Sequence, residues 1–184
     1  MKNILNFFII MSIAVLCSAC INSLAVQQLN EKAKEYSEKG KLSTAISRLE
    51  SSVDLDGNIF ESRYNLAVAY VEAKECEKAL EQINVAEKLK DSEPSVYYVQ
   101  GLANGCLAEK VYKTKDGEDV VYNDYNEALK SAKEYINYLK NANNAYEKYI
   151  RLTPASDQTQ NVTNTIMSNE KLITDYSNKY GISI

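Results

Sequence analysis

The stretch between Gln27 and Leu89 repeats its own pattern at a fixed period of 34 residues. A shift by this period superimposes residues of the same kind: Ala33 on Ala67, Tyr36 on Tyr70, Ala45 on Ala79, Ile46 on Leu80, Leu49 on Ile83 and Leu55 on Leu89. Within each copy the apolar residues recur at steps of three and four, which is the spacing of one helix face. Such a period is typical of stacked helical hairpins. With only two prolines and six glycines in the chain, we predict an all-α fold.

These residues resemble the signature of the tetratricopeptide repeat (TPR) family, which places Leu-Gly-x-x-Tyr in a first helix and Ala-x-x-x-Phe in a second. The second copy matches best, with Tyr64-Asn65-Leu66-Ala67-Val68-Ala69-Tyr70 followed by Ala79, Leu80, Ile83 and Ala86. The first copy keeps Ala33, Tyr36, Gly40, Ala45 and Leu49. The resemblance implies a right-handed superhelical stack of helix-turn-helix repeats at about 26–59, 60–93 and 94–154. It also implies that the repeated alanines and tyrosines belong to the core.

The third repeat is longer than the other two. Residues 97–102 resemble the family's first helix, and Ala142, Tyr146, Tyr149, Leu152 and Pro154 resemble the end of its second helix. About twenty extra residues, centred on 113–123, separate these two parts, and the insertion at 109–123 carries a turn signal at 115–117. We therefore predict an elongated hairpin with helices at about 94–112 and 124–152. Ser156 as N-cap and Gly181 as stop predict a C-terminal capping helix at about 156–180.

The N-terminus has the pattern of an export signal. Lys2 precedes an apolar run at 4–16, which is shorter than the roughly 18 to 20 residues that a permanent membrane span needs. We predict a signal peptide at 1–19 and exclude it from fold reasoning. The remaining residues suit one domain.

The end of that segment, Leu16-Cys17-Ser18-Ala19-Cys20, resembles the bacterial lipobox. The resemblance implies fatty acids such as palmitate on Cys20, a tether at 20–26 and a TPR-like domain at 27–184. Two or more acyl chains anchor a protein stably to a membrane. The alternative is ordinary cleavage after Ala19, which would leave a free protein. Because no aspartate follows Cys20, we expect the periplasmic face of the outer membrane of a bacterial cell envelope.

The chain lacks the residues that several kinds of chemistry require. Histidine is absent, which removes the commonest general base and the commonest zinc ligand. The net charge is −4 and there is no basic cluster, which argues against a nucleic-acid partner. We therefore predict no catalytic residues, no metal and no cofactor. Cys76 and Cys106 can form a disulfide or act as two separate buried apolar residues, and the residues alone favour the second.

The TPR resemblance implies a concave groove, lined by the first helix of each repeat, that binds a protein or peptide. The positions expected to line it are Asn30, Lys34, Tyr64, Asn65, Val68, Tyr98 and Leu102. Some family members clamp a peptide's terminal carboxylate with basic residues and asparagines. Asn65 and Lys34 match that clamp, but Ser95 and Val99 stand where basic residues should be, so we predict that a free C-terminus is not recognised.

These patterns together predict a membrane-anchored adaptor for protein–protein interaction in the cell envelope, serving an outer-membrane, secretion or pilus assembly. One alternative is a self-associating structural protein that pairs through its tyrosine-rich helix at 122–149. Another is an envelope hydrolase or ligand-binding protein, which would need a deep pocket with clustered ionisable groups. The tyrosines at 64 and 98 can also serve only as the floor of the groove.

Overall fold

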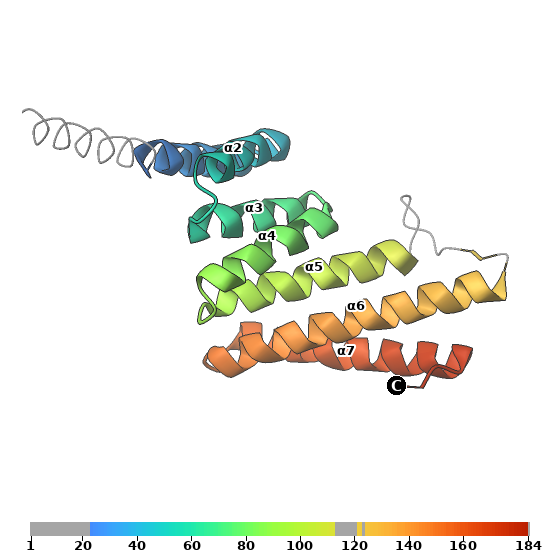
Figure 1. Ribbon diagram of the computed structural model, residues 1–184. Helices are drawn as coiled ribbons and strands as arrows, with labels where there is room; N and C mark the ends of the chain where they lie inside the picture. The colour runs from blue at the N-terminus through green and yellow to red at the C-terminus, as the bar shows by residue number, and fades with distance from the viewer. Residues whose placement is uncertain (1–22, 113–120, 123, 184) are drawn as a thin grey trace, which may run out of the picture. The chain divides into compact units, whose positions relative to one another are not determined.

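The computed structural model describes residues 23–112, 121–122 and 124–183. The first helix covers residues 23–38, and it is followed by α2 (Leu42–Leu55), α3 (Phe60–Glu72), α4 (Cys76–Leu89), α5 (Pro94–Tyr112), α6 (Tyr125–Leu152) and α7 (Asp157–Tyr180). These described residues contain no strand, so the all-α prediction is confirmed (Figure 1). The predicted signal peptide, Cys20 and the turn at 115–117 lie outside the described residues.

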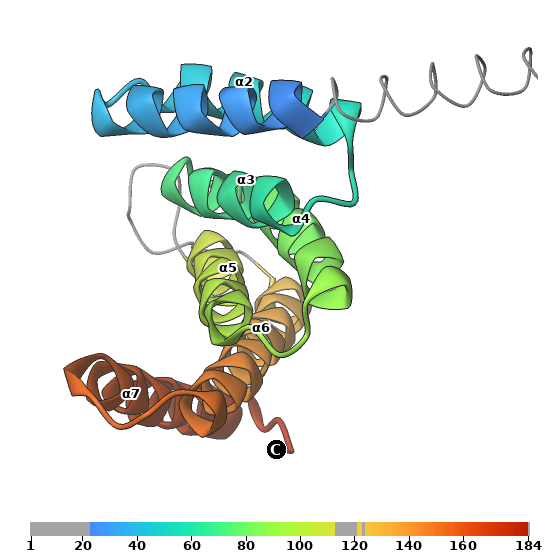
Figure 2. The same cartoon turned by 90° about the vertical axis from the view of Figure 1, so that its left-hand side faces the viewer.

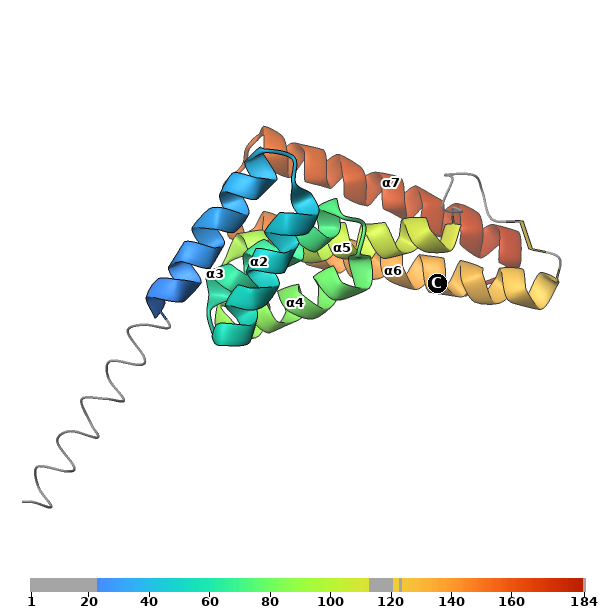
Figure 3. The same ribbon diagram turned by 90° about the horizontal axis from the view of Figure 1, so that it is seen from above.

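The helices group into two compact units, and the division falls inside α3. The first unit extends to Leu66 and the second begins at Ala67. In the first unit, helix 23–38 and α2 lie side by side and antiparallel (Figures 1 and 3). The apolar and small residues buried there are Val26, Ala33, Ala45, Ile46, Leu49 and Leu66. The expectation that the repeated alanines form core is confirmed by Ala33 and Ala45 here.

The turns that end the first helices of the first two hairpins have the same geometry and lie 34 residues apart. Gly40 adopts φ +69° and Lys74 adopts φ +59°, the left-handed conformation that commonly ends a helix. In each turn the next amide reaches back to a tyrosine carbonyl, Lys41 N to Tyr36 O and Glu75 N to Tyr70 O, both at 2.8 Å. The sequence period is therefore also a period of the backbone. Only glycine adopts this conformation without a steric cost, and Lys74 carries that cost.

In the second unit, α4, α5, α6 and α7 pack in chain order, each against the next (Figures 1 and 3). Helix α5 contacts α4 on one side and α6 on another, so it is buried on two faces. Two clusters join α6 to its neighbours. One contains Tyr97, Ala142, Tyr146, Tyr149, Val162 and Ile166, and the other contains Ala108, Tyr135, Ile136, Leu139 and Ile173.

The ends of α6 and α7 follow from local hydrogen bonding. The Asp124 carboxylate accepts hydrogen bonds from two amides of the first turn of α6, and the helix stops at Leu152 because the residue before Pro154 is extended. Ser156 and Thr159 form a capping box at the start of α7, and Gly181 adopts φ +63° at its end. The helix predictions at about 94–112, 124–152 and 156–180 are confirmed.

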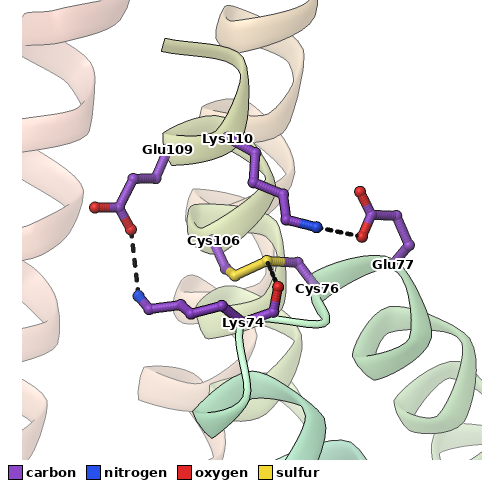
Figure 4. The surroundings of a disulfide bond; sticks show 6 residues. All are labelled: Lys74, Cys76, Glu77, Cys106, Glu109 and Lys110. Carbon is purple, nitrogen blue, oxygen red and sulfur yellow. Dashed lines mark hydrogen bonds and ion pairs between the residues drawn. A yellow bond between two sulfur atoms is a disulfide. The ribbon is translucent and has the colours of Figure 1, made fainter. Parts of the chain in front are cut away.

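One prediction about the cysteines is wrong. The sequence favoured two separate buried thiols, but the structure joins Cys76 to Cys106 in a disulfide, with their Cα atoms 5.8 Å apart. The bond links the first residue of α4 to α5 (Figure 4). Spacing along the chain carried no information about this distance, which arises from the packing of α4 on α5.

Candidate partner-binding surface

The four predicted groove residues of the first unit differ in their surroundings. Lys34 and Asn65 are exposed, whereas Tyr64 is half-buried and stacks on Phe60 with a centroid distance of 5.7 Å. Asn30 is engaged with its own chain. Its Nδ2 lies 3.0 Å from Val26 O and 2.9 Å from the hydroxyls of Ser52 and Ser62.

The Asn30 amide therefore has a structural task that the sequence did not indicate. Ser52 and Ser62 are completely buried and hydrogen-bond to each other at 2.8 Å. A buried hydroxyl needs a partner, and Asn30 supplies one to both serines. Its Oδ1 accepts a hydrogen bond from Asn65 Nδ2 at 3.3 Å. Of these two asparagines, the exposed Asn65 is the one that a partner can reach.

Val68, Tyr98 and Leu102 of the second unit are all half-buried. Tyr98 packs against α6, with its ring centroid 5.3 Å from that of Tyr149 and 6.2 Å from that of Tyr146. Tyr98 and Leu102 are four residues apart and share one side of α5. They occupy the same positions in the 34-residue period as Tyr64 and Val68. The same type of partly exposed apolar side chain thus recurs at two positions of the repeat.

The residues at the two clamp positions in α5 have no role in binding a carboxylate. Val99 is 2% exposed and belongs to the core. The hydroxyl of Ser95 donates a hydrogen bond to Glu93 Oε1 at 2.9 Å. Neither side chain can offer a positive charge to an anionic group.

The disulfide and two ion pairs fix α5 against the start of α4 (Figure 4). Lys74 Nζ lies 3.3 Å from Glu109 Oε2, and Lys110 Nζ lies 2.7 Å from Glu77 Oε2. The hydrogen bond from Lys110 lowers the pKa of the Glu77 carboxyl. All four charged side chains are largely exposed, so each pair stabilises the junction by at most about 1 kcal/mol. The disulfide is the stronger constraint on where α5 presents its side chains.

The second unit contains a polar hollow of about 270 Å³ that was not predicted from the sequence. It is lined by Leu80 and Asn84 of α4, Gln100 and Asn104 of α5, and Asn141, Asn144, Ala145 and Lys148 of α6. Gln100 and Asn104 lie two residues after Tyr98 and Leu102, which places them about 200° further around α5. The hollow is therefore on a different side of the helix from the predicted groove residues. The signal was present in the repeat, because Gln100 and Asn104 fall where the preceding copy has Leu66 and Tyr70.

The described residues contain no group of three or more His, Cys, Asp or Glu side chains placed to hold a metal ion. The same part of the chain includes no helix with the length and apolar character of a membrane span.

Comparisons with known proteins show the fold. No family model matches the chain, and no curated protein matches it in sequence. Among solved structures, the first TPR of Spaghetti (RPAP3) bound to an HSP90 peptide superimposes with a TM-score of 0.61 at 22% identity, over 83% of this chain and 95% of that chain. The first TPR domain of human RPAP3 gives 0.60 at 22%, over 84% and 97%. The Sgt2 TPR domain from Aspergillus fumigatus gives 0.59 at 17%, over 83% and 82%. The chain has the fold of a TPR domain.

Proposed function

We propose that this chain, which has the fold of a TPR domain, is an adaptor that binds a protein partner through the exposed sides of its first helices. The observation that carries the proposal is that half-buried apolar side chains recur at corresponding positions of two repeats. Tyr98 corresponds to Tyr64, and Leu102 corresponds to Val68. Tyrosine gives a large contact area with a polar tip and loses little rotamer entropy on binding. Lys34 and Asn65 add exposed polar groups in the first unit. Asn30 contributes by orienting Asn65.

The residues at the two carboxylate-clamp positions of α5, Ser95 and Val99, bear on which kind of peptide segment the partner would offer. The first TPR of Spaghetti is bound to the HSP90 peptide SRMEEVD, and the second TPR domain of human RPAP3 is in complex with the HSP70 peptide SGPTIEEVD. A clamp for a terminal carboxylate would have basic residues at two positions of α5. In this chain these positions hold the buried Val99 and Ser95, which hydrogen-bonds to Glu93. We propose that the partner offers an internal segment or a helix face to the first helices of the repeats.

We further propose that the adaptor works in a bacterial cell envelope, held by fatty acids on Cys20 at the periplasmic face of the outer membrane. The lipobox-like sequence supports the anchor. The Cys76–Cys106 disulfide supports an oxidising compartment, where such bonds form and persist. In this place the adaptor would recruit a subunit of an outer-membrane, secretion or pilus assembly.

Self-association through the tyrosine-rich helix has less support. Three of its tyrosines, Tyr135, Tyr146 and Tyr149, are each about 95% buried in the second unit itself. Their rings are therefore not accessible to a second copy. Tyr125 is the most exposed large hydrophobic residue on α6, at 61%.

Capture of partners from the native envelope by the full chain tests the binding surface. A Tyr64→Ala, Leu102→Ala variant should retain at least tenfold less partner, because hot-spot residues dominate interface energy. The matched control is Tyr125→Ala, Met167→Ala, which likewise removes one tyrosine and one flexible apolar side chain, here from exposed positions. Thermal unfolding of both variants verifies that they fold. Equal capture by the first variant and the intact chain would place the binding site elsewhere.

The anchor has a separate test. Growth with labelled palmitate should label the intact chain and leave a Cys20→Ser variant unlabelled and released from the membrane fraction. Labelling that survives the substitution would show that Cys20 is not the acylated residue, and the proposed binding surface would be unaffected.

A further inference from the structure

The polar hollow of the second unit carries an inference beyond the proposed function, since it lies on another side of α5. Its most informative members are Gln100 and Asn104, which are only 8% and 6% exposed. In the preceding repeat the same positions hold Leu66 and Tyr70, exposed by 2% and 4%. Two core positions of the repeat have thus changed from apolar to amide. A buried amide is unfavourable unless its hydrogen bonds are made.

The hydrogen bonds of these amides are only partly made. Gln100 Nε2 donates to Asn84 Oδ1 at 3.1 Å and to Glu87 Oε2 at 2.6 Å. Asn104 Nδ2 donates to the Gln100 main-chain carbonyl at 2.9 Å. Among the described residues, nothing donates to Asn104 Oδ1, although the residue lines the hollow. Unlike the enclosed hydroxyls of Thr153 and Ser177, this oxygen is not sealed from solvent.

The rim of the hollow adds further free amides. Asn141 and Asn144 project from α6, and their side chains make no hydrogen bond with any residue that the structure describes. The Nδ2 group of Asn84 is likewise unused within this part of the chain. One hollow therefore offers donors and acceptors from three helices, all as uncharged primary amides.

The charges near the hollow disfavour an anionic ligand. Lys148 is the one cation of its lining, and its Nζ lies 3.7 Å from Glu87 Oε1 and 4.9 Å from the centroid of the Tyr97 ring. A phosphate or carboxylate would have to compete with Glu87 for this lysine. The lining also contains no aromatic ring on which a sugar or a base could stack. The groups that remain match a neutral ligand rich in amides.

We propose that this hollow binds the main chain of an extended, uncharged peptide segment of a partner protein. An asparagine amide pairs a carbonyl acceptor with N–H donors, so it can accept from a peptide N–H and donate to a peptide carbonyl as a neighbouring strand does. Asn104 Oδ1 supplies the buried acceptor, and Asn84, Asn141 and Asn144 supply contacts at the rim. Recognition of the main chain makes binding tolerant of the segment's side chains. The site is independent of Tyr64 and Leu102.

The test uses the full chain, labelled with ¹⁵N and purified in detergent. The probe is an N-acetylated, C-amidated hexapeptide of alternating serine and threonine, titrated while the side-chain amide signals of asparagine are followed by NMR. We expect saturable shifts of the signals of Asn84, Asn104, Asn141 and Asn144. No saturable shift would overturn the proposal, as would tighter binding of methyl glucoside or inorganic phosphate at the same signals.

Two variants separate binding from folding. Gln100→Leu, Asn104→Tyr restores the apolar pattern of the preceding repeat, so it should fold at least as stably and bind the hexapeptide at least tenfold more weakly. Asn141→Ala, Asn144→Ala changes only exposed side chains and should also weaken binding about tenfold. Asn178→Ala, an exposed asparagine outside the lining, is the matched control and should bind normally. Unchanged affinity in Asn141→Ala, Asn144→Ala would overturn the proposal even if the first variant failed to fold.

Discussion

Gly101 and Gly105 lie one turn apart on α5 and differ in what surrounds them. A Cβ atom at position 101 would collide with the ring of Tyr146, whereas a Cβ atom at position 105 would meet nothing within 4 Å. Both positions are helical, where alanine is favoured over glycine by about 1 kcal/mol. The same substitution can therefore be compared at a crowded and an open position of one helix.

Gly101→Ala should lower the free energy of unfolding by about 1 to 3 kcal/mol, since overpacking outweighs the gain in helix propensity. Gly105→Ala should raise it by up to about 1 kcal/mol. Denaturant unfolding of both variants beside the parent chain measures the difference. The same change in both would show that Tyr146 does not pack closely over Gly101.

Tyr146 also makes stability depend on pH in the alkaline range. Burial raises the pKa of Tyr146 to about 12, while an unfolded chain loses this proton near pH 10. Above pH 10 the unfolded chain thus binds fewer protons than the folded one, so the free energy of unfolding falls as pH rises towards 12. The loss should be of order 2 kcal/mol from this group, and below pH 10 the contribution is constant.

Denaturant unfolding between pH 9 and 12 measures this loss. Tyr146→Phe keeps the ring and removes the ionisable hydroxyl, so its stability should fall less steeply over the same range. An identical pH dependence of the variant and the parent chain would mean that Tyr146 ionises freely in the folded state.

At the scale of the helices, the disulfide is the strongest single link between α4 and α5. It joins cysteines 30 residues apart, and closing a loop of that size in the unfolded chain corresponds to about 3 to 4 kcal/mol. Reductant should therefore lower the free energy of unfolding by roughly 2 to 4 kcal/mol. A Cys76→Ala, Cys106→Ala variant should have a lower free energy of unfolding than the parent chain without reductant, and reductant should not change it. Glu109→Gln, which breaks one exposed ion pair beside the bond, should change stability by less than about 1 kcal/mol.

The helices themselves were predictable because local signals define them. Apolar spacing, Pro154, Ser156 and Gly181 predicted α5, α6 and α7 closely. The pairing of Cys76 with Cys106 was not predictable, since it depends on how α4 and α5 pack. The Asn30 network with Ser52 and Ser62 was missed for the same reason. An asparagine at a groove position gives no sign that buried hydroxyls on two other helices need its amide.

For the whole molecule, the sequence predicted the fold more fully than the surfaces. The 34-residue period predicted stacked helical hairpins and the resemblance of the repeated residues implied a TPR fold, which solved structures confirm at only 15 to 22% identity. The polar hollow was missed because a search for apolar spacing passes over Gln100 and Asn104 as interruptions of a pattern. Comparison of equal repeat positions, Leu66 with Gln100 and Tyr70 with Asn104, identifies it directly. Positions that depart from the repeat are therefore more informative about function than positions that agree with it.

The Tyr98 and Leu102 side of α5 is the surface that we propose contacts a partner protein. The most direct test of this contact replaces Leu102 with a photoreactive phenylalanine derivative in the full chain and irradiates intact cells of the native host. A replacement of Met167, which is exposed on α7, is the control. We predict a discrete cross-linked protein from position 102 that is absent from position 167. No adduct at position 102, or the same adduct at both positions, would mean that this side of α5 is not the binding surface.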